Sequence, residues 1–385
     1  MSSQQISATV TAVVAVLGGG VAGLSVAAAL SHRVPVVVME REDVLSMHSS
    51  GRSVALYDPT YGPPVMRALT SASYATYTDS SRQSPAWTSP LGSLYVATSE
   101  QANSLAELMK RSGNDEFAVR HLKPDELRCM VPALKSDLFV GAAYQAAALS
   151  IDTAAVLDFY RRTILQNGGR ILLSSAPISI EQGGGRWKLR TSEHLVVCET
   201  ILNASGAWAD EVARQLSVPT IGIEPRKRTA AMCTVDRLDM VANAPFVFDI
   251  DERWYFRREP GGIIVSPADE SPTAPCDAQA DEYDVAVAID NVEKATVLSI
   301  KRVVRSWAGL RSFAPDHELV TGRDPAIPGI AWHVGLGGFG FQTAPAAAEL
   351  CAGLILDGAV PSRLAAYGIT VDAVTVSRLR PSIAA

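Results

Sequence analysis

The sequence predicts an α/β protein that combines a doubly wound, Rossmann-like domain with a second, mixed α+β domain whose sheet is mainly antiparallel. Two glycine-rich turns, at residues 18–23 and 335–343, indicate the first domain, because each follows an apolar strand and begins an Ala-rich helix. The segment 246–265 indicates the second domain, since its aromatic and β-branched residues lack the strand–helix rhythm that precedes them. A chain of 385 residues, 48% of them hydrophobic, has enough apolar side chains for two cores.

The first glycine turn has the spacing of a dinucleotide-binding site. An apolar strand, 13–17, runs into the sequence Gly-Gly-Gly-Val-Ala-Gly, and an Ala-rich helix follows. Gly18 permits the tight turn, Gly20 lets the backbone approach a pyrophosphate, and Gly23 lets the helix lie against its strand. The helix N-terminus offers free backbone N–H groups, including those of Val21 and Ala22, to the phosphates. The alternative, a glycine-rich turn without a nucleotide, is disfavoured by this context.

Glu40 indicates which nucleotide the turn would hold. It ends the second apolar strand, 35–39, where a carboxylate accepts hydrogen bonds from an adenosine ribose. A 2′-phosphate does not suit that position, so the sequence favours FAD or NAD over NADP. The loop 47–53 that follows has small residues, hydroxyls and one guanidinium, which can hold a phosphate or the edge of a ring.

Composition narrows the class of protein. The net charge of −6 is mild and the basic residues are scattered, so we expect no nucleic-acid partner and no anionic membrane surface. The five cysteines form no CxxC pair, which indicates a reduced compartment and no structural metal. Residues 5–32 carry no Asp, Glu, Lys or Arg, but the central glycines indicate a strand, turn and helix rather than a membrane span. We therefore expect a cytoplasmic protein without stable membrane insertion.

The rest of the chain reads as a series of predicted helices and strands. The pattern predicts helices at 65–77, 105–111 and 153–167, a strand at 170–173, and a hairpin around the glycines 183–185. A strand at 200–203 leads into the small-residue turn 203–208, which either contacts a ligand or serves only as a packing turn. The last glycine turn begins a helix that runs to residue 355, and we place Pro345 in its first turn, where proline is tolerated.

Six motifs, in this order along the chain, resemble the D-amino-acid oxidase superfamily of flavoproteins, and within it bacterial D-arginine dehydrogenases. They are residues 18–23, 40–42, 48–53, 203–208, 307–313 and 337–343. The resemblance implies a discontinuous FAD-binding domain formed by residues 1–85, 150–217 and 318–385, with a substrate-binding domain formed by 86–149 and 218–317. It also implies a non-covalent FAD, because 307–316, where sarcosine-oxidase relatives carry a flavin link, contains no cysteine.

The resemblance further implies oxidation of an amine carbon by hydride transfer to flavin N5. The imine product is hydrolysed to a 2-oxo acid and ammonia, and O₂ or a quinone reoxidises the flavin. An amino-acid substrate needs its carboxylate clamped, and a guanidinium makes the bidentate pair that fixes its orientation. The predicted catalytic residues are Arg311, Arg228, Tyr255 and Tyr61. The alternative is that the arginines are ordinary surface charges and the tyrosines core aromatics.

The cofactor contacts implied by the resemblance extend beyond the first turn. The N-terminus of the last helix is expected near the flavin C2 carbonyl, where its partial positive charge stabilises the reduced ring, with Gln342 and Thr343 as possible donors. The full set of expected cofactor residues is Gly18, Gly20, Val21, Ala22, Gly23, Glu40, Arg41, His48, Ser49, Ser50, Arg52, Ser53, Ile178, Ala204, Gly206, Trp208, Gly337, Gly340, Phe341, Gln342 and Thr343.

Departures from the D-arginine dehydrogenase pattern concern the substrate. Leu56 replaces a histidine, Ser93 replaces the glutamate that pairs with a guanidinium, and Phe248 replaces a smaller residue; Gly338 completes the predicted pocket. A buried guanidinium without that carboxylate is costly, so we expect a neutral or apolar side chain, or an N-substituted or biosynthetic tailoring amine. Asp58 either meets an amino group or is a solvated loop residue, and we favour the latter.

Two other classes of function compete with this interpretation. A non-catalytic flavin-binding module would retain the fold but would not be reduced by any amine. An NAD-dependent dehydrogenase is disfavoured by the second glycine turn at the far end of the chain.

Overall fold

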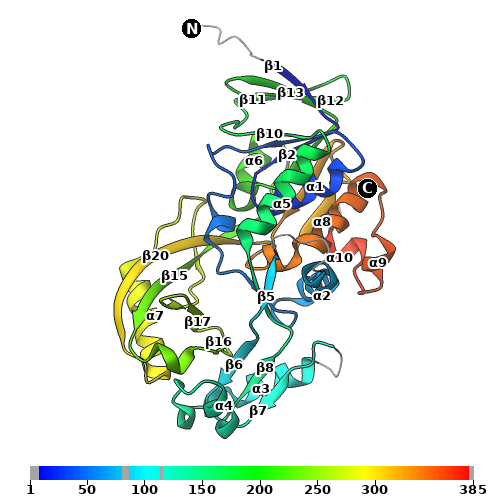
Figure 1. The fold of residues 1–385 in the computed structure, drawn as a ribbon. Coiled ribbons are helices and arrows are strands. Elements are labelled where there is room, and N and C mark those ends of the chain that lie inside the picture. Colours follow the sequence, from blue (N-terminus) through cyan, green and yellow to red (C-terminus); the bar gives the residue numbers. More distant parts are fainter. Residues whose placement is uncertain (1–7, 80–85, 113–115, 381–385) are drawn as a thin grey trace.

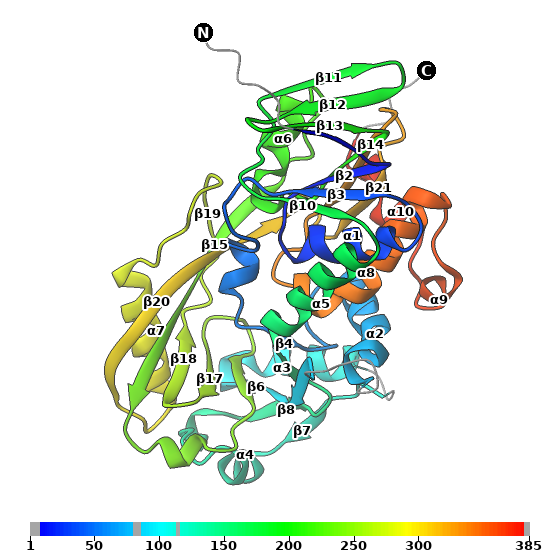
Figure 2. The same cartoon turned by 45° about the horizontal axis from the view of Figure 1, so that its top comes forward.

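The computed structural model describes residues 8–79, 86–112 and 116–380, which form four sheets with helices around them (Figure 1). Within this described part, none of the helices combines the length and the apolar character that crossing a bilayer requires. The six-stranded sheet lies in the upper part of the view and most of the nine-stranded sheet in the lower part, and Figure 2 shows the same arrangement after a 45° turn.

The first large sheet is the predicted doubly wound core. In spatial order its strands are β10 (Arg170–Leu172), β3 (Val36–Met39), β2 (Val14–Leu17), β14 (Thr200–Asn203), β22 (Ile330–Val334) and β21 (Val320–Arg323). All neighbours are parallel except the pair β21 and β22. The four central strands are entirely buried, which explains why they read as uninterrupted apolar runs.

Both faces of this sheet are covered. One face packs against the helices α1 (Val21–Ser31), α5 (Thr153–Gln166) and α8 (Gly340–Leu356). The other face packs against α6 (Ala209–Gln215) and a small sheet. The small sheet contains β1 (Ala8–Thr11), β13 (His194–Cys198), β12 (Arg186–Arg190) and β11 (Ser179–Gly183), and its last two strands form the predicted hairpin.

The second large sheet is mainly antiparallel, so the predicted fold class is confirmed. Its strands, in spatial order, are β19 (Ser271–Pro272), β15 (Glu224–Val235), β18 (Gly262–Ser266), β17 (Tyr255–Glu259), β16 (Phe246–Asp249), β6 (Ser93–Ala97), β8 (Gly141–Gln145) and β7 (Arg120–Leu122), while the long β20 (Ile300–Phe313) also pairs with β15. Among the described strands of this sheet, only the neighbours β6 and β16 run parallel. The helix α7 (Glu282–Ala295) packs against one side of this sheet.

The remaining elements connect the two large sheets or cover their edges. The sheet of β4 (Leu56–Tyr57), β9 (Leu149–Ile151) and β5 (Thr88–Pro90) lies at the junction and places Leu56 beside the second sheet. The other helices are α2 (Pro64–Thr78), α3 (Ala102–Arg111), α4 (Pro124–Met130), α9 (Ser362–Ala365) and α10 (Val371–Val374). The domain limits given above stay a prediction, and the limit at residue 85 lies outside the described residues.

The placement of Pro345 in the first turn of its helix is wrong. Helix α8 begins at Gly340, so the proline is its sixth residue, where it cannot donate to the carbonyl four residues earlier. That carbonyl, on Phe341, accepts a hydrogen bond from the hydroxyl of Tyr77 in α2 instead. A tertiary contact therefore compensates for the bond that the proline removes.

We predict that Tyr77→Phe lowers the free energy of unfolding by about 1–3 kcal/mol, because it leaves a buried carbonyl without a partner. Urea denaturation followed by circular dichroism measures the change. The matched control, Tyr283→Phe, alters a tyrosine that is 74% exposed and should change stability by less than about 0.5 kcal/mol. Equal stability of the two variants would show that Tyr77 does not compensate for the proline.

Candidate active site

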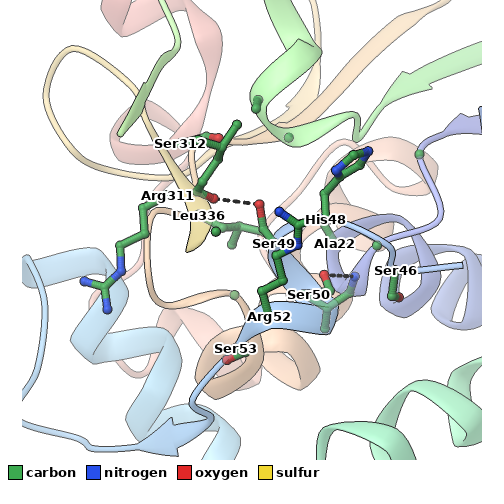
Figure 3. A pocket seen from close by; sticks show the side chains of 18 of the residues that line it. Ala22, Ser46, His48, Ser49, Ser50, Arg52, Ser53, Arg311, Ser312 and Leu336 are labelled. Atoms are coloured by element: carbon green, nitrogen blue, oxygen red, sulfur yellow. Dashed lines mark hydrogen bonds between the residues drawn. The ribbon is translucent and has the colours of Figure 1, made fainter. Parts of the chain in front are cut away.

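One pocket joins the two glycine turns. Its lining includes Gly18 to Ala22 from the first turn, Gly335 to Gly338 from the last turn, and Arg311 from β20. Figure 3 shows Arg311 at one end and Ser46 at the other, with Ser49, Ser50 and Arg52 between them. The turns meet because β2, β14 and β22 are parallel neighbours, so the loops that follow them emerge at the same edge of the sheet.

The first turn is built by close backbone contacts. Gly18 has a φ of +113°, and a Cβ there would lie 2.6 Å from the carbonyl oxygen of Ala204. A Cβ on Gly23 would lie 1.9 Å from the carbonyl oxygen of Gly18, so Gly23 packs the helix against the turn and does not line the pocket. Both glycines are required by sterics, whether or not a ligand is bound.

The N-terminus of α1 opens onto the pocket. Gly20, the residue before its first turn, makes no side-chain cap, and Ser50 Oγ accepts the N–H of Val21 at 2.9 Å. The turn around Ser50 is bonded to strand β20 of the second large sheet. Ser49 Oγ donates to the Leu310 carbonyl at 2.6 Å, and Arg52 Nη1 donates to the Ala308 carbonyl at 2.9 Å. The loop 49–52 therefore connects this helix to β20.

The far end of the pocket suits an adenosine. Glu40 accepts the N–H of Gly19 at 2.7 Å and that of Glu42 at 2.9 Å, which fixes its carboxylate at the strand end. Trp208 lies between the guanidinium of Arg41, 4.4 Å from its ring centre, and the ring of His48, 4.6 Å away. Glu40, the indole of Trp208 and the guanidinium of Arg41 are groups of the kinds that bind a ribose and a base.

His48 provides a test of whether a ligand fits. Its Nε2 lies 3.0 Å from Glu42, but its Nδ1 is buried without a hydrogen-bond partner among the described residues. His48 lines the pocket beside the uncapped start of α1. An orphaned nitrogen next to free helix N–H groups fits an anionic nucleotide such as FAD.

The start of α8 also faces the pocket, but its polar side chains are engaged with protein. Gln342 donates to the Tyr61 carbonyl at 3.3 Å and to Thr70 Oγ1 at 2.9 Å, and Thr343 Oγ1 donates to the Phe339 carbonyl at 2.8 Å. Thr343 is fully buried and does not line the pocket. The backbone N–H groups in the first turn of α8 are thus the donors that would remain for a ring bound there.

Arg311 and Tyr61 meet at the end of the pocket opposite Ser46, which we call the substrate end because the predicted carboxylate clamp lies there. Arg311 Nη1 donates to the hydroxyl of Tyr61 at 2.9 Å, and that hydroxyl donates to Glu252 at 2.8 Å. The last glycine turn lies directly against β20, since the N–H of Gly337 donates to the Ser312 carbonyl at 2.9 Å. A Cβ on Gly338 would lie 2.7 Å from Arg311 Cζ, so only glycine leaves room for this guanidinium.

Arg228 lies near Arg311 and shares a carboxylate with it. Its Nη2 donates to Glu270 at 2.6 Å, and Arg311 Nη1 lies 3.9 Å from the same oxygen.

Burial raises the pKa of Tyr61 to about 12, although the positive charge of Arg311 opposes the shift. The hydroxyl of Tyr61 therefore keeps its proton throughout the physiological range.

An aromatic wall completes the substrate end. Phe248 stacks on Phe246 with ring centres 4.3 Å apart and on Tyr95 with centres 5.2 Å apart, and the buried Tyr255 lies 5.7 Å from it. Phe246, Phe248, Tyr255 and Leu56 all line the pocket. The surface offered to a substrate side chain is mainly apolar.

The structure brings most of the predicted site residues together. The predicted residues that line the pocket are Gly18, Gly20, Val21, Ala22, Glu40, Arg41, His48, Ser49, Ser50, Arg52, Ser53, Leu56, Tyr61, Ala204, Gly206, Trp208, Arg228, Phe248, Tyr255, Arg311, Gly337, Gly338, Gly340, Phe341 and Gln342.

Four predicted residues lie outside the lining. Besides Gly23 and Thr343, these are Ile178 and Ser93. Ile178 is 67% exposed at the start of the hairpin, where its N–H donates to the Arg190 carbonyl. Ser93 is fully buried because its hydroxyl donates to Asp58. Asp58 is itself 0% exposed, so the prediction of a solvated loop residue is wrong.

His333 and Trp307 also belong to the pocket, although the sequence did not predict them as site residues. Trp307 lines the pocket and donates from Nε1 to the Arg52 carbonyl at 3.0 Å. His333 lines it from β22, with Nδ1 2.9 Å from Thr321 Oγ1. Burial lowers the pKa of His333 to about 3, which keeps the ring neutral. The available signal was a single ionisable residue inside an otherwise apolar strand.

The fold and the site together define a FAD-dependent oxidoreductase. Residues 14–354 match the family model described as DAO, FAD dependent oxidoreductase, and the chain belongs to this family. The predictions of the superfamily and of a flavin-dependent enzyme are thereby confirmed.

Individual relatives span almost the whole chain at low identity. The FAD-dependent oxidoreductase domain-containing protein 1 of Xenopus laevis is 24% identical, covering 90% of this chain and 79% of that protein. The glycine oxidase of Pseudomonas putida is 23% identical, covering 90% and 95%. Among solved structures, the L-proline dehydrogenase from P. horikoshii superimposes with a TM-score of 0.78 at 20% identity, covering 92% of this chain and 95% of that one.

We predict that Gly18→Ala reduces the FAD content of the purified protein about tenfold, because an alanine there is strained by about 1–3 kcal/mol and displaces the turn whose N–H groups would hold the phosphates. The ratio of flavin to protein absorbance measures it. Gly184→Ala is the matched control, since Gly184 also has a positive φ, +61°, but has no atom within 4 Å of the added Cβ. Normal FAD content in Gly18→Ala would contradict the assignment of the nucleotide site.

Proposed function

We propose that the protein oxidises the CH–NH bond of an amino acid or a related amine with non-covalently bound FAD. The observation that carries this proposal is the position of Arg311 and Tyr61 in the pocket that also contains both glycine turns. A carboxylate held there would leave the neighbouring amine carbon inside the pocket. Glycine oxidase and L-proline dehydrogenase, which share the fold, are named for substrates of this class.

The charges at the substrate end favour a single carboxylate. Arg311 and Arg228 supply two positive charges; Glu270 pairs with Arg228, and Glu252 is connected to Arg311 through the Tyr61 hydroxyl. The guanidinium of Arg311 can hold one acid group through a bidentate pair, and the Tyr61 hydroxyl becomes a second donor when it turns from Glu252 to that group. Removing the partner of a buried charge is costly, so the acid group binds more tightly here than a neutral group of the same shape.

Electron flow in the proposed reaction follows from the substrate and the cofactor. FAD, when bound, accepts the two electrons of the substrate C–H bond as a hydride. The substrate becomes an iminium or imine, which water converts to a 2-oxo acid and an amine. The protein residues orient the substrate by its acid group and present an apolar wall to its side chain.

The aromatic wall favours a substrate with a neutral or apolar side chain. Phe248, Tyr255 and Leu56 line the pocket, while Asp58 is hidden behind them with its carboxylate bonded to protein donors. N-substituted amino acids, with a methyl group or a ring on nitrogen, suit the same wall. A strongly cationic substrate such as D-arginine lacks an exposed carboxylate partner on this wall and is disfavoured.

Attachment of FAD is proposed to be non-covalent. None of the five cysteines lines the pocket; Cys129 and Cys276 are exposed elsewhere, and Cys198, Cys233 and Cys351 are buried in the cores. Denaturation with acid should release all of the yellow chromophore into the supernatant.

The substrate class is tested by mixing the purified protein anaerobically with D-, L- and N-methyl amino acids and following the flavin absorbance. We expect bleaching by amino acids with neutral side chains, and much slower bleaching by the matched amines that lack the carboxylate. A flavin that no amine reduces would identify the protein as a non-catalytic flavin-binding module.

We predict that Arg311→Ala costs about 3 kcal/mol or more in transition-state stabilisation, a loss of about a hundredfold or more in the second-order rate constant for flavin reduction. Stopped-flow absorbance measures the rate. Arg302→Ala, on the exposed half of the same strand, is the matched control and should retain the wild-type rate. Similar rates in the two variants would exclude Arg311 as the carboxylate ligand.

A further inference from the structure

Asp58 is a buried carboxylate that the proposed chemistry leaves unused. Its side chain is 0% exposed and does not line the pocket, although Leu56 and Tyr61, two and three residues away, do. Within the described part of the chain, Asp58 forms no ion pair with a Lys, Arg or His. A buried carboxylate is costly unless hydrogen bonds compensate it, so its surroundings must serve a purpose.

Four donors compensate this carboxylate, and they come from two different parts of the fold. Oδ1 accepts the N–H of Thr60 at 2.8 Å and the hydroxyl of Thr60 at 2.6 Å, which closes the turn 58–61. Oδ2 accepts the hydroxyl of Tyr95 at 2.6 Å and that of Ser93, both on β6 of the second large sheet. Asp58 thus attaches the turn to the second large sheet.

The same turn is attached on its other side to α8, the helix that begins at the last glycine turn. Gln342 in α8 accepts the N–H of Asp58 at 3.4 Å and donates to the carbonyl of Tyr61 at 3.3 Å. The turn closes on itself, since the N–H of Tyr61 donates to the Asp58 carbonyl at 3.2 Å. Its backbone is therefore held between the two large domains.

The way this turn is held determines the position of Tyr61, its last residue. Its hydroxyl lies 2.9 Å from Arg311, and its ring packs 5.0 Å from Phe339 and 6.3 Å from Phe248. The following residue, Gly62, has a φ of +108°, so the chain leaves the turn in a conformation that other residues rarely adopt. Any rotation of the turn would move the hydroxyl away from the guanidinium.

We propose that Asp58 is a positioning residue that sets the affinity for the substrate's acid group by holding the Tyr61 hydroxyl against Arg311. This inference rests on the proposed function and adds the residue that determines how well the clamp is organised. Asp58 itself touches neither substrate nor cofactor. Its action is confined to carboxylate binding, and it leaves the oxidation step unchanged.

The kinetic test uses the neutral amino acid that bleaches the flavin fastest. Asp58→Ala should raise the concentration needed for half-maximal flavin reduction about tenfold, since one charged hydrogen bond is misplaced, and should change the limiting rate less than about threefold. Asp58→Asn should restore most of the affinity. Its amide oxygen still accepts from Thr60, and the two hydroxyls on β6 can turn to accept from its nitrogen.

A double-mutant cycle separates positioning from general destabilisation. If Asp58 acts through Tyr61, Asp58→Ala should add little to the loss already caused by Tyr61→Phe. Full additivity of the two losses would overturn the proposal. Tyr95→Phe provides an independent variant if Asp58→Ala does not fold, because it removes one donor to the same oxygen and should weaken the same binding step.

Crystal structures of the FAD-loaded wild-type protein and of Asp58→Ala test the placement without reference to activity. We expect the Tyr61 hydroxyl to leave Arg311 in the variant; an unchanged contact would overturn the proposal. Asp324→Asn is the matched control, since Asp324 is 4% exposed and bonded to Trp332 and Arg380 far from the turn, and it should retain the contact and the affinity. A wild-type flavin that no amino acid reduces would refute the proposed function and leave this structural result to decide the placement.

Discussion

The parallel register of β3, β2, β14 and β22 is the constraint on which the rest of the structure depends. Because these strands end at one edge, the turns that follow them meet in a single pocket, although they lie more than 300 residues apart in the sequence. Two helices, α1 and α8, then begin at that pocket; neither N-cap residue makes a side-chain cap, although Ser50 accepts the N–H of Val21 in α1. Their free N–H groups and partial positive charges favour an anionic, electron-accepting ligand.

The substrate end depends on contacts that cross between the two large sheets. Ser49 and Arg52 tie the first helix to the carbonyl groups of β20, and the last glycine turn pairs with the same strand at Ser312. These contacts hold Arg311 next to the turn that begins α8. Gln342, expected from sequence to contact the ring through its side chain, instead connects this helix to the turn that carries Tyr61. Cofactor and substrate groups are thus held by one continuous hydrogen-bonded network.

Features encoded by local sequence were predictable. The strand, glycine turn and helix at residues 14–31 follow from short-range sterics, and Glu40 follows from the length of one strand–helix–strand unit. Features that depend on tertiary partners were not. Pro345 lies deeper in its helix than expected because Tyr77 supplies the missing bond, and Asp58 is buried because Ser93 and Tyr95 come from a distant strand. Ile178 was carried over from a resemblance, but the hairpin places it in solvent.

The central claim is that both glycine turns hold one FAD, the first at its phosphates and the last at its ring, and that Arg311 faces that ring. The most direct measurement is a crystal structure of the FAD-loaded protein, from which the position of the ring relative to the guanidinium is read. The account predicts the ring between the start of α8 and Arg311, with space for one amino acid between them. A ring bound elsewhere, or a guanidinium turned to solvent, would contradict it.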